Sequence, residues 1–130
     1  MTIFETITGA NVKDCVQIDD AIGFLVEQGY MGLAIGKSGK SIEKVRKSIG
    51  KKVMVVEYAE DTVKFVKNLF QPVMIRQARI TETGTGKIAV IEVSKKDRAK
   101  AFGYNGERIK IAKEMLDRHC SLSDVIIKTI

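Results

Sequence analysis

Two short loops carry the residues whose types and spacing indicate a particular chemistry. They are Gly36-Lys37-Ser38-Gly39 and Gly103-Tyr104-Asn105-Gly106, 67 residues apart, and each is followed by a stretch typical of a basic amphipathic helix. Two glycines separated by two residues, at a break between helices, let a phosphodiester backbone approach the chain more closely than any side chain would permit. The pattern therefore predicts a nucleic-acid-binding loop that occurs twice.

The positive charge of the chain is concentrated around these loops. The net charge is +6, with 22 basic and 16 acidic residues and a pI near 9.4. Residues 36–52 include seven basic residues and one acidic residue, and residues 95–113 include seven and two, so the two segments carry +11 and the rest of the chain −5. Focused positive potential attracts phosphates, although a lysine-rich stretch can also be an ordinary solvated helix face.

The apolar pattern predicts the same succession of elements in each half of the chain. In the first half we expect a helix over 2–8, strands over 15–18 and 21–27 around a turn at 19–20, a short helix over 31–34, a helix between Gly39 and Gly50, and a strand over 53–56. In the second half we expect a helix over 62–70 ended by Pro72, strands over 73–80 and 87–93 joined through 84–86, helices over 97–102 and 107–118, and a strand over 125–127.

An offset of 67 residues aligns the two halves around the loops. It pairs Ala34 with Ala101, both glycines of one loop with those of the other, and Ile42 with Ile109. Each copy thus has an apolar residue three positions after its second glycine, on the side of the following helix that packs against a sheet. The chain is therefore predicted to contain an internal repeat.

The residues around the first loop, Leu33-Ala34-Ile35-Gly36-Lys37-Ser38-Gly39-Lys40-Ser41-Ile42, resemble the core of a KH domain. In that family a Gly-X-X-Gly loop joins two helices and clamps single-stranded nucleic acid. Residues 101–109 are similar, and over its whole length the chain resembles the short archaeal NusA family of transcription termination and elongation factors. The resemblance implies an α+β fold of tandem prokaryotic (type II) KH domains, at residues 1–60 and 61–130, without catalytic chemistry.

The resemblance also implies which residues bind single-stranded RNA, about four nucleotides in each unit. In the first unit they are the loop, two lysines and two apolar residues at the floor of a groove: Gly36, Lys37, Ser38, Gly39, Lys40, Lys44, Ile35 and Ile42. In the second unit they are Gly103, Tyr104, Asn105, Gly106, Arg108, Lys110, Phe102 and Ile109. The apolar residues among them can equally be ordinary core.

The second loop departs from the family pattern, because Tyr104 and Asn105 replace the small or basic residues usual between the glycines. Tyr104 could stack on a base, which contributes about 1–3 kcal/mol, or be an exposed residue of a loop that grips less well. The first unit is therefore expected to make the stronger phosphate contacts.

Three alternatives remain open at this stage. The KH units could serve ribosomal RNA or single-stranded DNA instead of a transcript. Residues 34–41 also fit a relaxed nucleotide-binding loop in which Lys40 and Ser41 would contact phosphates and magnesium, although such a loop needs a strand leading into it. Bacterial relatives carry further domains that this chain has no residues to supply, so direct polymerase contact and a longer natural N-terminus are open questions.

Nothing else in the sequence predicts a cofactor, a metal site, a small-molecule substrate or a membrane segment. Cys15 and Cys120 are isolated and expected to be buried or partly buried free thiols, and His119 is expected at a helix end. No apolar run approaches the roughly 20 residues that span a bilayer, and the N-terminus lacks signal-peptide features. A cytoplasmic protein is expected, with the transcription machinery as a possible partner.

Overall fold

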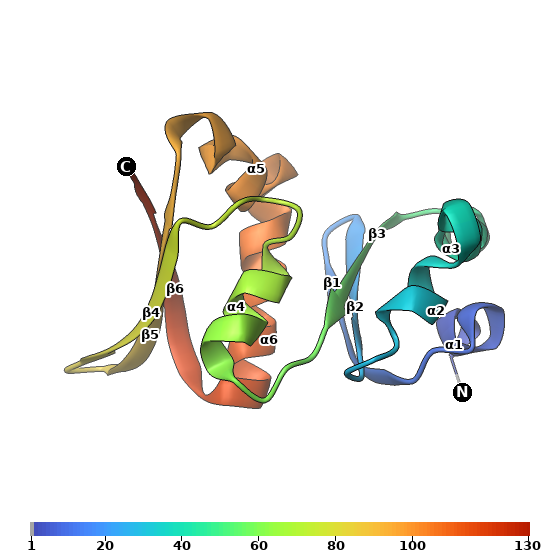
Figure 1. Cartoon of the computed structure of the whole chain (residues 1–130), viewed down its shortest axis with the longest axis horizontal. Coiled ribbons are helices and arrows are strands. Elements are labelled where there is room, and N and C mark those ends of the chain that lie inside the picture. The colour runs from blue at the N-terminus through green and yellow to red at the C-terminus, as the bar shows by residue number, and fades with distance from the viewer. Residues whose placement is uncertain (1) are drawn as a thin grey trace. The chain divides into compact units, whose positions relative to one another are not determined.

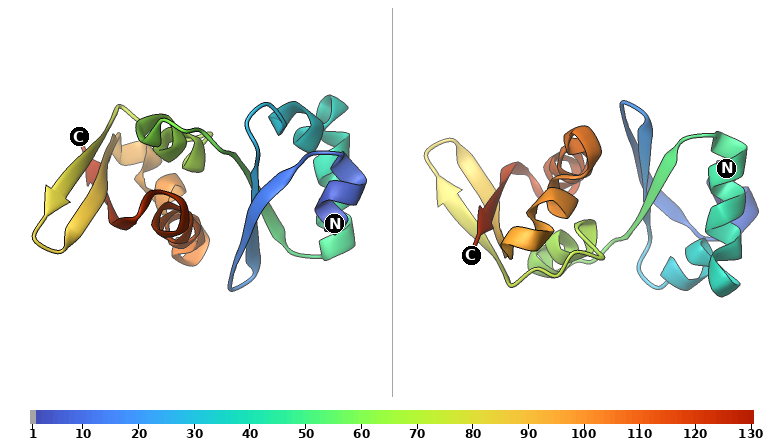
Figure 2. Two further views of the ribbon diagram at one scale, coloured as in Figure 1. Left: turned by 90° about the horizontal axis from the view of Figure 1, so that it is seen from below. Right: turned by 90° about the horizontal axis from the view of Figure 1, so that it is seen from above.

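The computed structural model describes residues 2–130, which form two compact units, one up to Ala59 and one from Glu60 to Ile130 (Figure 1). Each unit is a three-stranded sheet with helices against one face (Figures 1 and 2). The mixed α+β class that the family resemblance implies is confirmed.

The first unit contains α1 (Ile3–Thr8), β1 (Val12–Ile18), β2 (Ala21–Val26), α2 (Met31–Ile35), the 3₁₀ turn η1 (Lys37–Gly39), α3 (Lys40–Ile49) and β3 (Lys52–Glu57). In its sheet, β2 is the central strand, antiparallel to β1 and parallel to β3. Parallel strands cannot be joined by a tight hairpin. The chain between β2 and β3 therefore crosses over through α2 and α3, which places the first glycine loop beside the sheet.

The second unit has the same order of α-helices and strands, with one additional 3₁₀ turn. Its elements are α4 (Thr62–Leu69), β4 (Gln77–Thr83), β5 (Gly86–Val93), η2 (Lys95–Asp97), α5 (Arg98–Phe102), η3 (Tyr104–Gly106), α6 (Glu107–Cys120) and β6 (Leu122–Thr129). Strand β5 is central, antiparallel to β4 and parallel to β6. The second glycine loop thus lies in the crossover between two parallel strands, as the first does.

The core of the first unit forms where the helices meet β2, whose residues are buried along its whole length. Phe4 of α1 stacks on Phe24 of β2, with ring centroids 4.3 Å apart and an interplanar angle of 23°. Ile42 and Val45, three residues apart on α3, add the inner face of that helix. Their spacing matches one face of an α-helix, so the apolar pattern after Gly39 orients α3 against the sheet.

Helix α1 has only six residues, and its ends are stabilised locally. The Thr2 hydroxyl accepts a hydrogen bond from the Glu5 N–H, and the Glu5 carboxylate accepts one from the Thr2 N–H, which is a capping box. The same carboxylate accepts a hydrogen bond from the Val12 N–H at the start of β1. These backbone donors lower the pKa of Glu5 and tie the helix to the edge strand.

Three predicted strands differ from the structure by more than one residue at a boundary, and one of them is β6, predicted over 125–127 but formed by Leu122–Thr129. The apolar residues Val73, Met74 and Ile75 suggested that a strand begins at residue 73, but β4 begins at Gln77. The Val73 N–H donates to the Phe70 carbonyl oxygen (2.8 Å), so the chain is still turning there, and Met74 is 71% exposed. Strand β1, predicted over 15–18, begins at Val12, because it pairs with β2 as far as Val26.

The isolated cysteine and histidine side chains lie in ordinary structural positions. His119 is in the last turn of α6, as predicted, with its ring edge-on to Phe65. Cys120 is a half-buried free thiol, whereas Cys15 is exposed, contrary to the prediction that both are at least partly buried. The reason is that β1 is an edge strand whose burial alternates, and Cys15 falls on its outward face.

The neighbouring residues Phe4 and Ile3 provide a matched test of the first core. Phe4 is completely buried and Ile3 is 51% exposed. We expect Phe4→Ala to lower the free energy of unfolding of the first unit by about 3–5 kcal/mol, and Ile3→Ala by less than about 1 kcal/mol. Urea unfolding followed by circular dichroism measures both, and equal losses would contradict the assigned core.

The two thiols should differ in reactivity. Burial raises the pKa of the Cys120 thiol, partly offset by a hydrogen bond with Thr62. A raised pKa leaves less reactive thiolate at neutral pH, and half-burial also hinders access. Exposed Cys15 is therefore expected to be alkylated first by iodoacetamide, as followed by peptide mass spectrometry. Faster labelling of Cys120 would contradict its placement.

Candidate nucleic-acid interface

The first glycine loop has a backbone conformation that its glycines make possible. Gly36 adopts φ 78° and ψ 171°, a region populated almost only by glycine. A Cβ on Gly36 would lie 2.7 Å from the Ser41 Cβ and 2.8 Å from the Ser41 nitrogen. Ser38 and Gly39 follow in left-handed conformations, with φ 54° and 74°. The chain therefore turns between α2 and α3, with Lys37 and Ser38 exposed at the turn.

The second loop has almost the same backbone although two of its four residues differ. Gly103 adopts φ 79° and ψ 171°, and Asn105 and Gly106 have φ 53° and 72°. In both loops the N–H of the second glycine donates to the carbonyl oxygen of the first, at 3.1 Å and 3.0 Å. Asparagine is one of the few residues that tolerate the left-handed region, so Asn105 suits the position that Ser38 occupies in the first loop.

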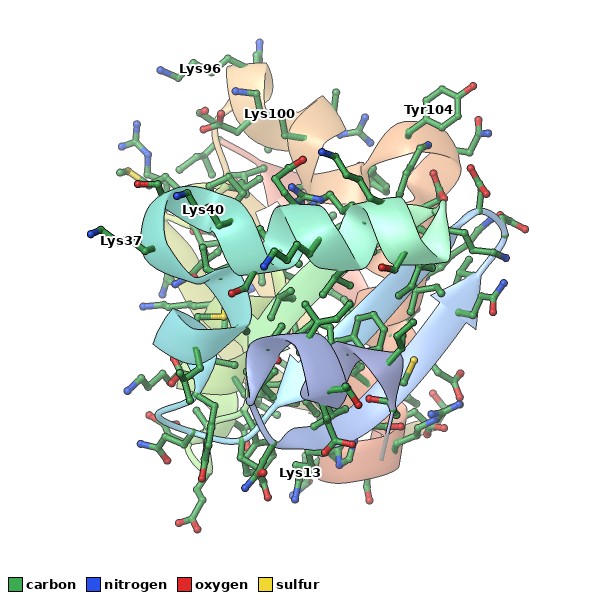
Figure 3. The ribbon with its side chains drawn as sticks, turned by 90° about the vertical axis from the view of Figure 1, so that its right-hand side faces the viewer. Lys13, Lys37, Lys40, Lys96, Lys100 and Tyr104 are labelled. Atoms are coloured by element: carbon green, nitrogen blue, oxygen red, sulfur yellow. The ribbon has the colours of Figure 1, made fainter. Side chains whose placement is uncertain are left out.

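In the first unit the structure gathers the predicted cations at one place. Lys37 and Lys40 project outward at the start of α3 (Figure 3), and Lys44 is exposed one turn further along. These three lysines form no ion pair with any residue that the structure describes. The N-terminus of α3 adds the positive end of the helix dipole beside the loop. The loop and α3 together therefore present a positively charged surface.

The predicted apolar residues are largely part of the core. Ile42 and Ile109 are only 5% and 8% exposed and hold α3 and α6 in place. Ile35 and Phe102, each just before a first glycine, are half-buried. Of the four, Ile35 and Phe102 keep the more accessible surface beside the loops.

Arg108 is where the structure differs most from the expectation of a free phosphate contact. Its side chain is half-buried, and its Nη1 donates a 2.7 Å hydrogen bond to the carbonyl oxygen of Gln71, 37 residues earlier. Burial lowers the pKa of the guanidinium, which still stays protonated at neutral pH. Arg108 thus ties the start of α6 to the turn after α4, a contact that no local sequence signal reveals.

Tyr104 occupies an outward position in the second loop. Its side chain is 72% exposed and projects from η3 (Figure 3). Phe102, two residues earlier, lies under the Arg98 guanidinium, whose central carbon is 4.9 Å from the ring centroid. Two aromatic rings therefore flank Gly103, whereas Ile35 and Lys37 flank Gly36.

The surroundings of the first loop do not suit a nucleotide hydrolase. A nucleotide-binding loop follows a buried strand, but helix α2 leads into Gly36. Among residues 2–130 there is no group of three or more His, Cys, Asp or Glu side chains placed to bind a metal ion. Across the same residues, no helix combines the length and apolar character needed to cross a membrane.

Comparison with known proteins is consistent with this geometry. A family model described as KH domain matches residues 1–98. The chain is 33% identical over 122 residues to a probable transcription termination protein NusA of Methanocaldococcus jannaschii, covering 94% of this chain and 67% of that protein. The chain belongs to the KH domain family, among its NusA-like members. Proteins of this kind are non-enzymatic factors.

Two further similarities extend over most of the chain. A probable transcription termination protein NusA of Halococcus morrhuae is 34% identical over 125 residues, covering 96% of this chain and 89% of that protein. The crystal structure of APE1850 is 35% identical, with a TM-score of 0.78, and the match covers 97% of this chain and 93% of that one. The KH similarity of residues 1–98 includes the whole first unit and part of the second.

The glycine requirement of the first loop can be tested on stability alone. We expect Gly36→Ala to destabilise the first unit by at least about 1–3 kcal/mol, the usual cost of a disfavoured backbone conformation, since its Cβ would also collide with Ser41. Gly32→Ala in α2 is the control, because a Cβ there meets nothing within 4 Å, and alanine favours a helix by about 1 kcal/mol. Similar melting temperatures for the two variants would contradict this account.

Proposed function

We propose that the chain is a NusA-like RNA-binding transcription factor that holds single-stranded RNA in two KH domains, residues 1–60 and 61–130. It would act in the cytoplasm in the control of transcription termination or elongation. The observation that carries the proposal is the agreement of the two loops, whose first glycines share φ values of 78° and 79° and the same ψ of 171°. Each loop also joins two helices in a unit with the same order of α-helices and strands.

In the first domain we infer that the loop N–H groups and the N-terminus of α3 face phosphates. Lys37, Lys40 and Lys44 would supply charge-assisted contacts along the same stretch of backbone. Bases would then lie toward Ile35, beside a loop whose two glycines place no side chain between protein and RNA. About four nucleotides fit such a clamp.

In the second domain we infer that stacking on bases contributes a larger share of RNA binding than in the first domain. Tyr104 is exposed in the middle of its loop, and an aromatic face accepts any base. Asn105 keeps the loop conformation without adding charge. The second domain would therefore extend the bound length of RNA and help to set its register.

The proposal is tested by placing negative charge where a phosphate is expected. In the double variant Lys37→Asp/Ser38→Asp, single-stranded RNA affinity should fall at least about tenfold, because like charges repel at the contact. Aspartate tolerates the left-handed conformation of residue 38, so the fold should survive. Fluorescence anisotropy measures affinity, and circular dichroism checks folding.

A matched control lies at the other end of the same helix. Lys47-Ser48 has the same two residue types, both exposed, in the last turns of α3. Lys47→Asp/Ser48→Asp therefore makes the same change in charge away from the loop, and it should alter affinity by less than about threefold. Equal losses in both variants would show a general charge effect and contradict the clamp.

The RNA class requires its own experiment. Crosslinking in cells followed by sequencing of the bound nucleic acid should recover nascent transcripts. Recovery of mainly ribosomal RNA, or of single-stranded DNA, would retain the fold and the clamp but contradict a role in transcription.

A further inference from the structure

The two units carry their available cations on different helices. In the first unit, α2 contains no charged residue, and the exposed lysines follow Gly36. In the second unit, the segment before Gly103 is the basic one. It comprises η2 and α5 and contains Lys95, Lys96, Arg98 and Lys100.

The cations that follow the second loop are engaged within the unit. Arg108 donates to the Gln71 carbonyl oxygen and is half-buried. The Lys113 Nζ lies 3.1 Å from the Asp124 Oδ1, and the hydrogen bond from Lys113 lowers the pKa of that carboxyl. Lys110 also has an interaction partner within the protein. Helix α6 therefore offers little of the free positive charge that α3 offers.

The lysines before the second loop are in the opposite situation. Lys95, Lys96 and Lys100 are exposed and form no ion pair with any residue from 2 to 130. Lys96 and Lys100 project outward from the η2–α5 segment, on the unit that also presents Tyr104 (Figure 3). The one acidic residue of the segment, Asp97, accepts a 3.0 Å hydrogen bond from the Ser94 hydroxyl. Its charge is thereby directed to the start of the segment.

The η2–α5 segment that carries these lysines is anchored next to the loop. Ala101 is completely buried, and Gly103 donates its N–H to the Ala99 carbonyl oxygen (2.9 Å). The Arg98 guanidinium lies over Phe102, so that cation is already held against the helix. Lys95, Lys96 and Lys100 are left as the exposed charges. Of these, Lys96 and Lys100 are seen to project outward (Figure 3), and Lys100 is only three residues from Gly103.

We propose that Lys96 and Lys100 are the phosphate-binding cations of the second unit. In the second unit the nucleic-acid backbone would then contact the η2–α5 segment, which precedes the glycine loop. In the first unit it would contact η1 and α3, at and after the glycine loop. The inference rests on the proposed RNA-binding function and replaces Arg108 and Lys110 as the main charge contacts of the second loop. Tyr104 and the outward face of α5 would together hold one stretch of RNA.

The test removes this charge and compares it with an equal loss elsewhere in the unit. The variant is Lys96→Ala/Lys100→Ala, and the control is Lys64→Ala/Lys67→Ala on α4, where both lysines are also exposed. Affinity of the full chain for a random-sequence single-stranded RNA pool is measured over a series of salt concentrations. The slope of log K against log salt is negative, and each lost phosphate contact makes it shallower by about 0.7.

We expect Lys96→Ala/Lys100→Ala to weaken binding about tenfold at moderate salt. The negative slope of log K against log salt should become shallower by about 1.4, the value for two contacts. The control should change affinity less than about twofold. A third variant, Lys110→Ala, should resemble the control. Circular dichroism should show the same fold in all three.

The outcomes separate this inference from the proposed function. If the wild-type chain binds RNA and Lys37→Asp/Ser38→Asp weakens it, but Lys96→Ala/Lys100→Ala behaves like its control, the inference is overturned and the function stands. A larger loss with Lys110→Ala than with the double variant would place the contacts on α6 and also overturn it. If the wild-type chain binds no RNA at any salt concentration, both fail.

Discussion

The constraint on which the rest depends is the abrupt reversal of the backbone at each Gly-X-X-Gly loop. Helix α3 begins at Lys40, only five residues after α2 ends at Ile35. The intervening turn passes so close to Ser41 that Gly36 has no space for a Cβ. Of the four residues in the first loop only Lys37 and Ser38 carry side chains, and both are exposed. The second loop repeats the geometry, with Gly103 packed against Arg108.

The sheet and the short helices convert this local turn into a positioned site. Strand β2, buried along its whole length, receives α3 through Ile42 and Val45 and α1 through the stacked pair of Phe4 and Phe24. Because interiors are closely packed, the start of α3 has little freedom relative to the sheet. The two residues between the glycines differ from one loop to the other, but packing holds the first loop in a fixed position beside the sheet. A preformed loop of this kind does not need to be ordered when a nucleic acid binds.

The two units show how one backbone can carry different electrostatics. Around the first loop the cations lie on η1 and α3, and around the second they lie on η2 and α5. Net charge in a sequence window does not distinguish these cases, since Arg108 and Lys113 count as positive although Gln71 and Asp124 engage them. Burial and partners decide which charges remain available to a ligand. Helix α6, which follows the second loop, has fewer available cations than α3. The second loop is also the one with aromatic side chains, Phe102 and Tyr104, on both sides of its first glycine.

The sequence by itself determined the features that depend on local chemistry. Glycine spacing located both loops, and the periodicity of Ile42, Val45 and Ile109 oriented the helices, because these signals act within a few residues. The tertiary structure decided the features that depend on distant partners: the start of β4 beyond the turn at Phe70, the exposure of Cys15 on an edge strand, and the bond from Arg108 to Gln71. Such contacts join residues far apart in the chain. Only the folded packing can therefore show which charges and apolar surfaces remain open to a partner.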